Sequence, residues 1–145
     1  MAFSPDGRWL AANDGRFWET DSWSEVRRSE PHNHMVFSSN SKILAQASNA
    51  GVVRLIDPQS GREYARLEDP RQDPVRWLYF NHSDTQLVVT WSDIHVWDLR
   101  AIRQELNRLG LDWDLPPYPA TSATVPVKSV VVEPTEKATP PGRTP

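Results

Sequence analysis

Three segments of the chain repeat one order of apolar and polar positions. Each opens with a short apolar stretch that ends in an aromatic residue, at Phe3, Phe37 and Phe80. A polar turn, a compact apolar run and a second turn follow, and then a stretch such as 53–55 in which apolar and polar residues alternate. Because side chains of a pleated strand point alternately to opposite faces, this alternation predicts β-strands. Each segment is therefore expected to form a small sheet of short antiparallel strands.

The turns and the spacing of the segments narrow the architecture. The first turn, 4–7, reads Ser-Pro-Asp-Gly, in which proline presets φ, aspartate bonds the nearby backbone and glycine accepts the left-handed conformation. The aromatic residues that close the first strands are 34 and 43 residues apart. A period of about 40 residues with several strands per unit is typical of the blades of a β-propeller.

These units resemble WD repeats, which form the four-stranded blades of β-propellers. The resemblance rests on Phe-Ser-Pro-Asp-Gly at 3–7, Val-Arg-Leu-Ile-Asp at 53–57 and, above all, Val-Trp-Asp at 96–98, and it covers about residues 1–98. It is specific because a turn motif, a period and a terminal Trp-Asp pair occur together. The repeat signature consists of Phe3, Asp6, Gly7, Phe37, Asp57, Phe80, Thr90, Trp97 and Asp98.

The resemblance also implies a buried hydrogen-bond network of Asp, His, Ser or Thr, and Trp. Thr90 and Trp97 provide two members of this network in the last unit, but Ala50 stands where a turn aspartate is expected. Ile56 replaces the tryptophan of the second unit, and no Gly-His pair precedes a repeat at the usual distance. We therefore expect blades that are held together by packing, without a complete network.

After Asp98 the apolar period changes from two to 3.6, which predicts a helix. Its apolar stripe consists of Leu99, Ile102, Leu106 and Leu109. Asp98 is placed as the N-cap and Gly110 as the C-terminal stop, while polar residues that include Arg103 line the remaining circumference. We expect this stripe to dock on the last blade. Coiled-coil pairing is the alternative, but it needs three to four heptads and fewer than two are present.

Composition divides the chain into a folded part and a tail. All seven tryptophans precede Asp114, whereas eight of the thirteen prolines lie at or beyond Pro116. A Pro- and Thr-rich stretch without periodicity does not close a core. We expect an all-β fold: a partial WD-type β-propeller arc of about three blades, one C-terminal amphipathic helix and a disordered tail. The predicted boundaries are 1–98 for the blades (about 1–30, 31–70 and 71–98), 99–115 for a docking helix and anchor, and 116–145 for the tail.

Charge and cysteine content exclude several classes of function. Sixteen Lys and Arg against 19 Asp and Glu give a net charge of −3, so we expect no basic face for nucleic acid or anionic membrane. Without cysteine there is no disulfide scaffold and no thiolate ligand or nucleophile. No apolar run approaches the ~18 residues of a membrane-spanning helix. We therefore expect a soluble, cytoplasmic chain that binds neither nucleic acid nor membrane.

The sequence offers little for catalysis. His32 and His34 are two residues apart and would share one face of a strand, as metal ligands can, but zinc requires a third ligand and no cysteine or nearby carboxylate pair supplies it. No nucleophile elbow, phosphate-binding loop or protein-kinase motif is present. We expect no enzyme activity, no bound metal and no cofactor.

The number of repeats raises the question of how a ring is completed. A propeller closes with 4–8 blades, and about three are predicted here. An open arc leaves the flanks of its end blades without a neighbour. Three explanations stay open: the missing blades lie in cis, in a longer propeller of which this chain is the C-terminal part; several copies complete a ring in trans; or the arc is stable alone.

The predicted function is that of a non-catalytic protein-interaction scaffold, as the C-terminal fragment of a larger WD-repeat protein. The stretch 111–119, together with 102–106, resembles the ends of WD-repeat regions in large bacterial proteins of planctomycete type, which are often fused to a Ser/Thr protein kinase. The alternative is therefore a regulatory or sensor segment of a signalling enzyme such as a kinase, whose catalytic domain is absent from this chain. Candidate contacts with an unknown protein or peptide partner are Trp23, Arg71, Arg76 and Trp91, since aromatic and arginine side chains dominate interfaces.

Overall fold

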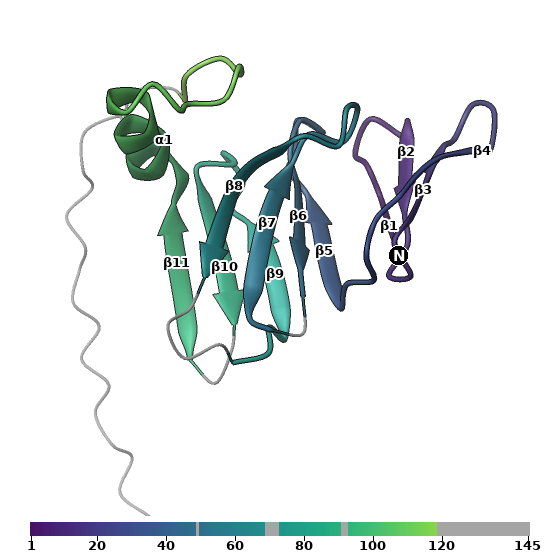
Figure 1. The fold of residues 1–145 in the computed structure, drawn as a ribbon, viewed down its shortest axis with the longest axis horizontal. Coiled ribbons are helices and arrows are strands. Elements are labelled where there is room, and N and C mark those ends of the chain that lie inside the picture. The colour runs from purple at the N-terminus through teal and green to yellow at the C-terminus, as the bar shows by residue number, and fades with distance from the viewer. Residues whose placement is uncertain (49, 69–72, 91–92, 119–145) are drawn as a thin grey trace, which may run out of the picture.

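The computed structural model describes residues 1–48, 50–68, 73–90 and 93–118. Its strands form three antiparallel sheets that stand side by side in chain order (Figure 1). The first sheet consists of β1 (Ala2–Phe3), β2 (Trp9–Ala11), β3 (Arg16–Glu19) and β4 (Ser24–Arg28). The second consists of β5 (His34–Phe37), β6 (Leu44–Ala47), β7 (Val52–Ile56) and β8 (Glu63–Glu68). The third consists of β9 (Trp77–Phe80), β10 (Gln86–Thr90) and β11 (Ile94–Asp98).

Each sheet is a blade in which consecutive strands pair edge to edge. The first strands of neighbouring blades touch, β1 with β5 and β5 with β9, so they lie at the inner side of the arc. The later strands follow outward in sequence order. The first two blades have four strands, and the third has three within the described residues.

Every blade presents two rows of side chains, because directly opposite residues of paired strands lie on the same side of a sheet. We call the row that faces the preceding blade the leading row and the row that faces the following blade the trailing row. The leading rows are Phe3, Leu10 and Trp18; Phe37, Leu44 and Ile56; and Phe80, Leu87 and Trp97. The trailing rows are Ala2, Ala11 and Phe17; Val36, Ala45 and Leu55; and Tyr79, Val88 and Val96.

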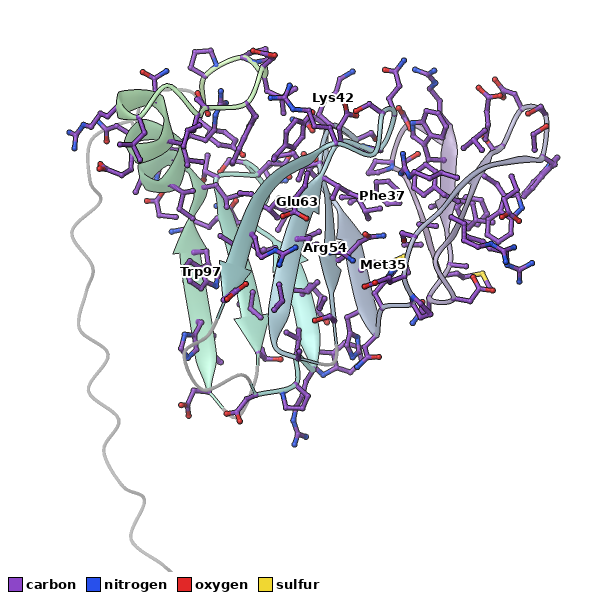
Figure 2. The ribbon with its side chains drawn as sticks, in the orientation of Figure 1. Met35, Phe37, Lys42, Arg54, Glu63 and Trp97 are labelled. Atoms are coloured by element: carbon purple, nitrogen blue, oxygen red, sulfur yellow. The ribbon has the colours of Figure 1, made fainter. Side chains whose placement is uncertain are left out.

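The first two blades pack through the trailing row of one and the leading row of the other. The resulting core contains Ala11 and Phe17 from the first blade and Phe37 and Leu44 from the second. The rings of Phe17 and Phe37 lie 6.4 Å apart. Figure 2 shows Met35 and Phe37 projecting from β5 toward the first sheet. Burial of these apolar side chains stabilises the contact between the two blades.

The second and third blades meet in the same way and form the larger core. Ala45 and Leu55 of the second blade pack with Leu87 and Val89 of the third, and all four are fully buried. In β7, Val53 and Leu55 point inward while Arg54 is only half-buried, which is the period-two alternation that the sequence predicted. The core therefore consists of interfaces between blades.

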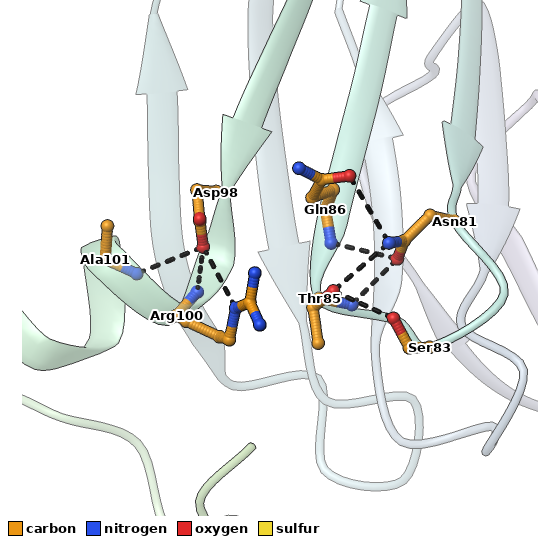
Figure 3. Close-up of polar contacts among 7 residues, drawn as sticks. All are labelled: Asn81, Ser83, Thr85, Gln86, Asp98, Arg100 and Ala101. Carbon is orange, nitrogen blue, oxygen red and sulfur yellow. Dashed lines mark hydrogen bonds and ion pairs between the residues drawn. The ribbon is translucent and has the colours of Figure 1, made fainter. Parts of the chain in front are cut away.

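One helix, α1 (Leu99–Arg108), follows the third blade and has both predicted ends. The Asp98 carboxylate accepts hydrogen bonds from the backbone N–H groups of Arg100 at 2.9 Å and Ala101 at 3.2 Å (Figure 3). At the other end, Gly110 has φ 70°, and the N–H of the following residue, Leu111, donates to the carbonyl of Leu106 at 2.8 Å. This is the bonding of a Schellman motif, which satisfies carbonyls at a helix end.

The helix docks on the blades through a shorter stripe than predicted. Leu99 is fully buried, and Ile102 and Leu106 pack against the larger core. The prediction for Leu109 is wrong: it is the C-cap and is exposed, because the chain leaves the helix there. Arg103 is buried instead, although we expected it on the exposed side of the helix.

The predicted fold class is confirmed: the chain is mainly antiparallel β-structure in about three propeller blades, followed by one helix. Packing continues beyond the helix to Tyr118, which contacts the larger core, three residues past the predicted end of the anchor. Residues 119–145 of the predicted disordered tail lie outside the described part of the chain.

Candidate interaction surfaces

The turn after the first strand of each blade has the same backbone form. Gly7, Ser41 and Asp84 hold its last position and have φ of 75°, 59° and 55°. In the second and third blades, this residue bonds the turn of the preceding blade. The N–H of Asp6 donates to Ser41 Oγ at 3.0 Å, and Ser39 donates its N–H and its hydroxyl to the Asp84 carboxylate at 2.8 and 2.6 Å. Turn-to-turn hydrogen bonds thus accompany each apolar contact between blades.

Two of the signature aspartates, Asp6 and Asp57, act locally, in turns. Asp6 accepts hydrogen bonds from Ser4 Oγ at 2.6 Å and from the N–H of Arg8 at 3.1 Å, and the bond from Ser4 is the main reason that the pKa of Asp6 is lowered. Asp57 accepts from the N–H of Gln59 and from Ser60 Oγ, both at 2.8 Å. These hydrogen bonds fix the geometry of the two turns.

The last blade has two members of the expected network, and they do not bond each other. Thr90 Oγ1 and Trp97 Nε1 are buried and have no hydrogen-bond partner among the described residues. The turn of this blade is instead organised by Asn81, whose Oδ1 accepts from the N–H groups of Thr85 at 2.9 Å and Gln86 at 3.0 Å (Figure 3). The polar contacts of this turn therefore come from Asn81 and not from Thr90 or Trp97.

The structure separates the candidate contact residues. Trp23 lies in the turn between β3 and β4, whereas Arg76 directly precedes β9 and bonds the carbonyl of Thr90 through its N–H. By the antiparallel strand order these two positions are at opposite rims of the blades. Both side chains are exposed. Arg71 and Trp91 lie outside the described residues.

Trp23 combines exposure with an unfavourable backbone. Its side chain is 64% exposed, and its φ is 51°, in the left-handed region. The corresponding position of the β7–β8 turn is Gly61, with φ 77°. A residue other than Gly, Asn or Asp rarely takes this conformation, and backbone strain of this kind concentrates at functional positions. Trp23 is therefore the strongest single candidate on the rims.

The third blade exposes its trailing row. Tyr79, Val88 and Val96 are directly opposite one another across β9, β10 and β11, and Ile94 extends the same side of β11. Tyr79 and Val96 are each 55% exposed and Ile94 is 72% exposed. Trp77 lies at the margin, where its ring is 5.5 Å from that of His34. These side chains form an apolar face with no blade against it in the described structure.

The first blade exposes its leading row in the same manner. Phe3 is 55% exposed, and Leu10 and Trp18 are half-buried beside it. The Arg16 guanidinium lies 5.0 Å above the ring of Trp18. This flank is therefore a second apolar face, at the opposite end of the arc (Figure 1).

Sequence reasoning missed the side chain that organises the C-terminal segment. Arg103 is 7% exposed and holds the Asp112 carboxylate with two bonds of 2.9 and 3.0 Å. Its guanidinium also donates to the carbonyls of Trp113, Leu115 and Pro116. The bond from Arg103 is the main reason that the pKa of Asp112 is lowered. No local pattern marks this role, because every partner comes from the chain that returns after the helix.

The anchored segment covers blade residues. Trp113 is buried, and its ring lies 5.5 Å from that of Tyr64 on β8. Tyr118 is half-buried near Arg103, and burial raises its pKa to about 12. The segment that follows α1 therefore packs on the second blade and on the helix.

The two candidate metal ligands do not form a site. The ring of His32 is buried: its Nδ1 donates to the carbonyl of Glu30 at 3.0 Å, and Gln46 Nε2 donates to its Nε2 at 3.1 Å. Burial lowers the pKa of His32, which favours the neutral ring. His34 contacts Trp77 instead. Across the ranges that the structure describes, no group of three or more His, Asp or Glu side chains is placed to bind a metal.

The comparisons with known proteins agree on the fold. The chain matches no protein-family model. It is similar to a protein transport protein SEC31 of Kluyveromyces lactis, with 31% identity over 101 residues, which are 68% of this chain and 8% of that protein. Among solved structures it is similar to U3-55K and to the WD40 repeats of RRP9, each at 23% identity and a TM-score of 0.59 over 69% of this chain. The β-propeller domain of Cps50 (Swd1) from Myceliophteria thermophila gives 22% identity and a TM-score of 0.56 over 68%.

These similarities define the class of protein. The matched structures are WD40 propellers, of which this chain spans 34–35% of the length, and it spans 8% of the SEC31 protein. At such identities the structures establish the fold: an arc of WD-type β-propeller blades. Together with the SEC31 similarity they support a WD-repeat family. No helix in the part of the chain that the structure describes is long and apolar enough to cross a membrane.

Proposed function

We propose that this chain is a non-catalytic protein-interaction module, formed by the C-terminal blades of a larger WD-repeat protein. Its blades are rigid because their cores are apolar and their turns are bonded to one another. Rigid scaffolds position exposed loop side chains for recognition. The similarity to about a third of each propeller and the two exposed rows support the view that further blades belong to the complete assembly.

Trp23 is the observation that carries the interaction role. A large aromatic side chain occupies a turn position where the second blade has glycine, and it remains in solvent. Tryptophan is among the residues that contribute most to binding energy at protein interfaces. We propose a protein or peptide partner that covers Trp23. The net charge of −3 favours neither nucleic acid nor an anionic membrane as that partner, and a cytoplasmic location is part of the proposal.

Affinity purification with matched variants tests this role. The intact chain and Trp23→Gly are used as baits in lysate of the source organism, and the recovered proteins are quantified. Glycine tolerates the left-handed turn, so the variant is expected to fold at least as well while losing the aromatic contact. A specific partner should fall several-fold in the Trp23→Gly eluate. Leu111→Ser, at a residue that is also 64% exposed, is the control and should retain the partner. Equal recovery with Trp23→Gly would contradict the proposal.

The position of the chain within a larger protein has a separate test. Reading the gene upstream of Met1, in frame, should reveal further units with the strand–turn–strand pattern of the three blades. An upstream reading frame without such units would contradict the fragment part of the proposal. The signalling-enzyme alternative stays a prediction, and it requires protein-kinase motifs in that upstream sequence.

A further inference from the structure

The third blade lacks the outer strand that the other two blades have. In the first and second blades a fourth strand, β4 or β8, pairs with the third strand, whereas β11 is the outermost strand of the third blade among the described residues. A strand at the edge of a sheet presents backbone N–H and C=O groups that no other strand satisfies. This open edge is distinct from the trailing row, because the edge lies in the plane of the sheet and the row lies on its face.

The register of the sheet shows which backbone groups of β11 are directed to this edge. Leu99 donates its N–H to the carbonyl of Thr85 at 2.9 Å. Because hydrogen-bonded and non-bonded pairs alternate along an antiparallel ladder, Trp97 bonds β10, whereas Ile94 and Val96 direct their N–H and C=O groups away from β10. These two residues therefore offer the hydrogen-bonding groups that an additional strand would use.

The second blade shows what satisfies the same groups. Val53 and Leu55 of β7 are equivalent to Ile94 and Val96 of β11, and both are paired with residues of β8. The strand that covers this edge runs antiparallel to the third strand and begins at the rim where the third strand ends. A strand with the same direction and the same starting rim would complete the third blade.

The chain after β11 stays on that rim. In the second blade, β7 is followed by Asp57, a short turn and β8. In the third blade, Asp98 holds the equivalent position, and α1 with the anchored segment stands in place of the short turn. Tyr118 at the end of this segment lines a pocket together with Lys42 and Ser83, which lie in the β5–β6 and β9–β10 turns. Figure 2 shows Lys42 on the rim that also carries α1, so the chain continues beyond Tyr118 from the rim at which β8 begins.

One stretch of the following sequence has the composition of a strand. Residues 127–133 read Val-Lys-Ser-Val-Val-Val-Glu, with four valines between Pro126 and Pro134. Valine favours strands, whereas proline interrupts a ladder and is found at strand ends. The stretch has seven residues, against six in β8. Residues 119–126 reach up to about 26 Å when extended, which exceeds the roughly 14 Å across a four-stranded sheet.

We propose that residues 127–133 pair with β11 of the same chain as an antiparallel fourth strand and complete the third blade. Ile94 and Val96 supply the backbone groups for this ladder, as Val53 and Leu55 do for β8. The trailing row stays open to a further blade, because the added strand occupies the edge of the sheet. Trp23 lies in the first blade, and its role does not enter the argument, so this inference and the proposed function fail separately.

Amide hydrogen exchange of the full chain, followed by NMR, tests the pairing. Val130→Pro combined with Val131→Pro removes N–H groups from both edges of the segment, so the N–H of Val96 should exchange roughly tenfold faster than in the natural chain. Ala138→Pro combined with Thr139→Pro is the matched control outside the segment and should leave that rate unchanged. The N–H of Val53, which pairs with β8, should exchange equally in all three chains and report that the blades are folded. Equal exchange of Val96 in the natural chain and in the first variant would overturn the inference.

Nuclear Overhauser contacts in the natural chain test the direction of the strand and the chain it comes from. Antiparallel pairing places Val127 near Asp98 and Glu133 near Ile94, whereas the reverse order would overturn the inference. A sample that mixes isotope-labelled and unlabelled copies separates contacts within one copy from contacts between copies. We expect contacts within one copy. Contacts between copies would show that the segment is exchanged between chains and would overturn the proposed pairing.

Discussion

Trp23 and Gly61 occupy equivalent turn positions in the first and second blades, but their surroundings differ. Both have positive φ, and the left-handed conformation costs a residue other than glycine about 1–2 kcal/mol. In the second blade, a Cβ at Gly61 would also lie 2.6 Å from Arg27 Nη1, so the Arg27 side chain would have to shift. In the first blade the tryptophan adopts the left-handed conformation despite its energetic cost, and its side chain stays exposed. The difference can be measured as stability.

We expect Trp23→Gly to raise the free energy of unfolding by up to about 1 kcal/mol, because relief of the left-handed strain exceeds the extra entropy lost by glycine. Urea denaturation of the chain gives this quantity. Asp21→Gly lies in the same turn without a positive φ and should lower the stability instead. A destabilised Trp23→Gly variant would show that the tryptophan contributes to the fold.

His32 predicts a dependence of stability on pH. Burial lowers its pKa in the folded chain, whereas in the unfolded chain the pKa is about 6.5. The unfolded state therefore binds a proton first as the pH falls, so the contribution of neutral His32 is complete above about pH 6.5 and is lost between that value and its folded-state pKa. The free energy of unfolding should decrease between pH 7.5 and pH 5. His32→Gln removes the titrating ring and should flatten this part of the profile; an unchanged slope would contradict the assignment.

At the scale of elements, α1 and the segment after it depend on Arg103. Removing one partner of a buried ion pair costs roughly 3–5 kcal/mol, because the other partner remains desolvated. In Arg103→Met, the Asp112 carboxylate and three carbonyls lose their donor. We expect the anchor to detach while the blades persist, so that chymotrypsin cleaves at Trp113 many times faster than in the natural chain.

A second arginine provides the control for that cleavage. Arg62 also pairs with the anchored segment, at 3.4 Å from Asp114, but both side chains are largely exposed. Exposed ion pairs contribute little to stability, so Arg62→Met should leave the cleavage rate nearly unchanged. Equal rates in Arg62→Met and Arg103→Met would show that burial of the guanidinium is not what holds the anchor.

The ends of the helix were predictable from the sequence, and its burial was only partly so. Asp98 and Gly110 act through bonds to residues within five positions, and such local chemistry is visible in a sequence. Arg103 is an exception to helical amphipathicity: a charged residue is buried because a later segment returns with a carboxylate and free carbonyls. Leu109 was misplaced because periodicity continued past the point at which the helix ends. Contacts that depend on a returning chain leave no period in the sequence.

At the scale of the whole molecule, repetition made the fold predictable. The aromatic residues Phe3, Phe37 and Phe80 occupy one position of successive blades, and a period that large has few explanations other than stacked units. The period does not show what covers the outer side of the first blade or of the third blade. The same residue type is buried at position 37 and exposed at position 3 because only the neighbour differs. The candidate surfaces and the conformation of Trp23 therefore depend on the folded structure and could not be predicted from the repeat.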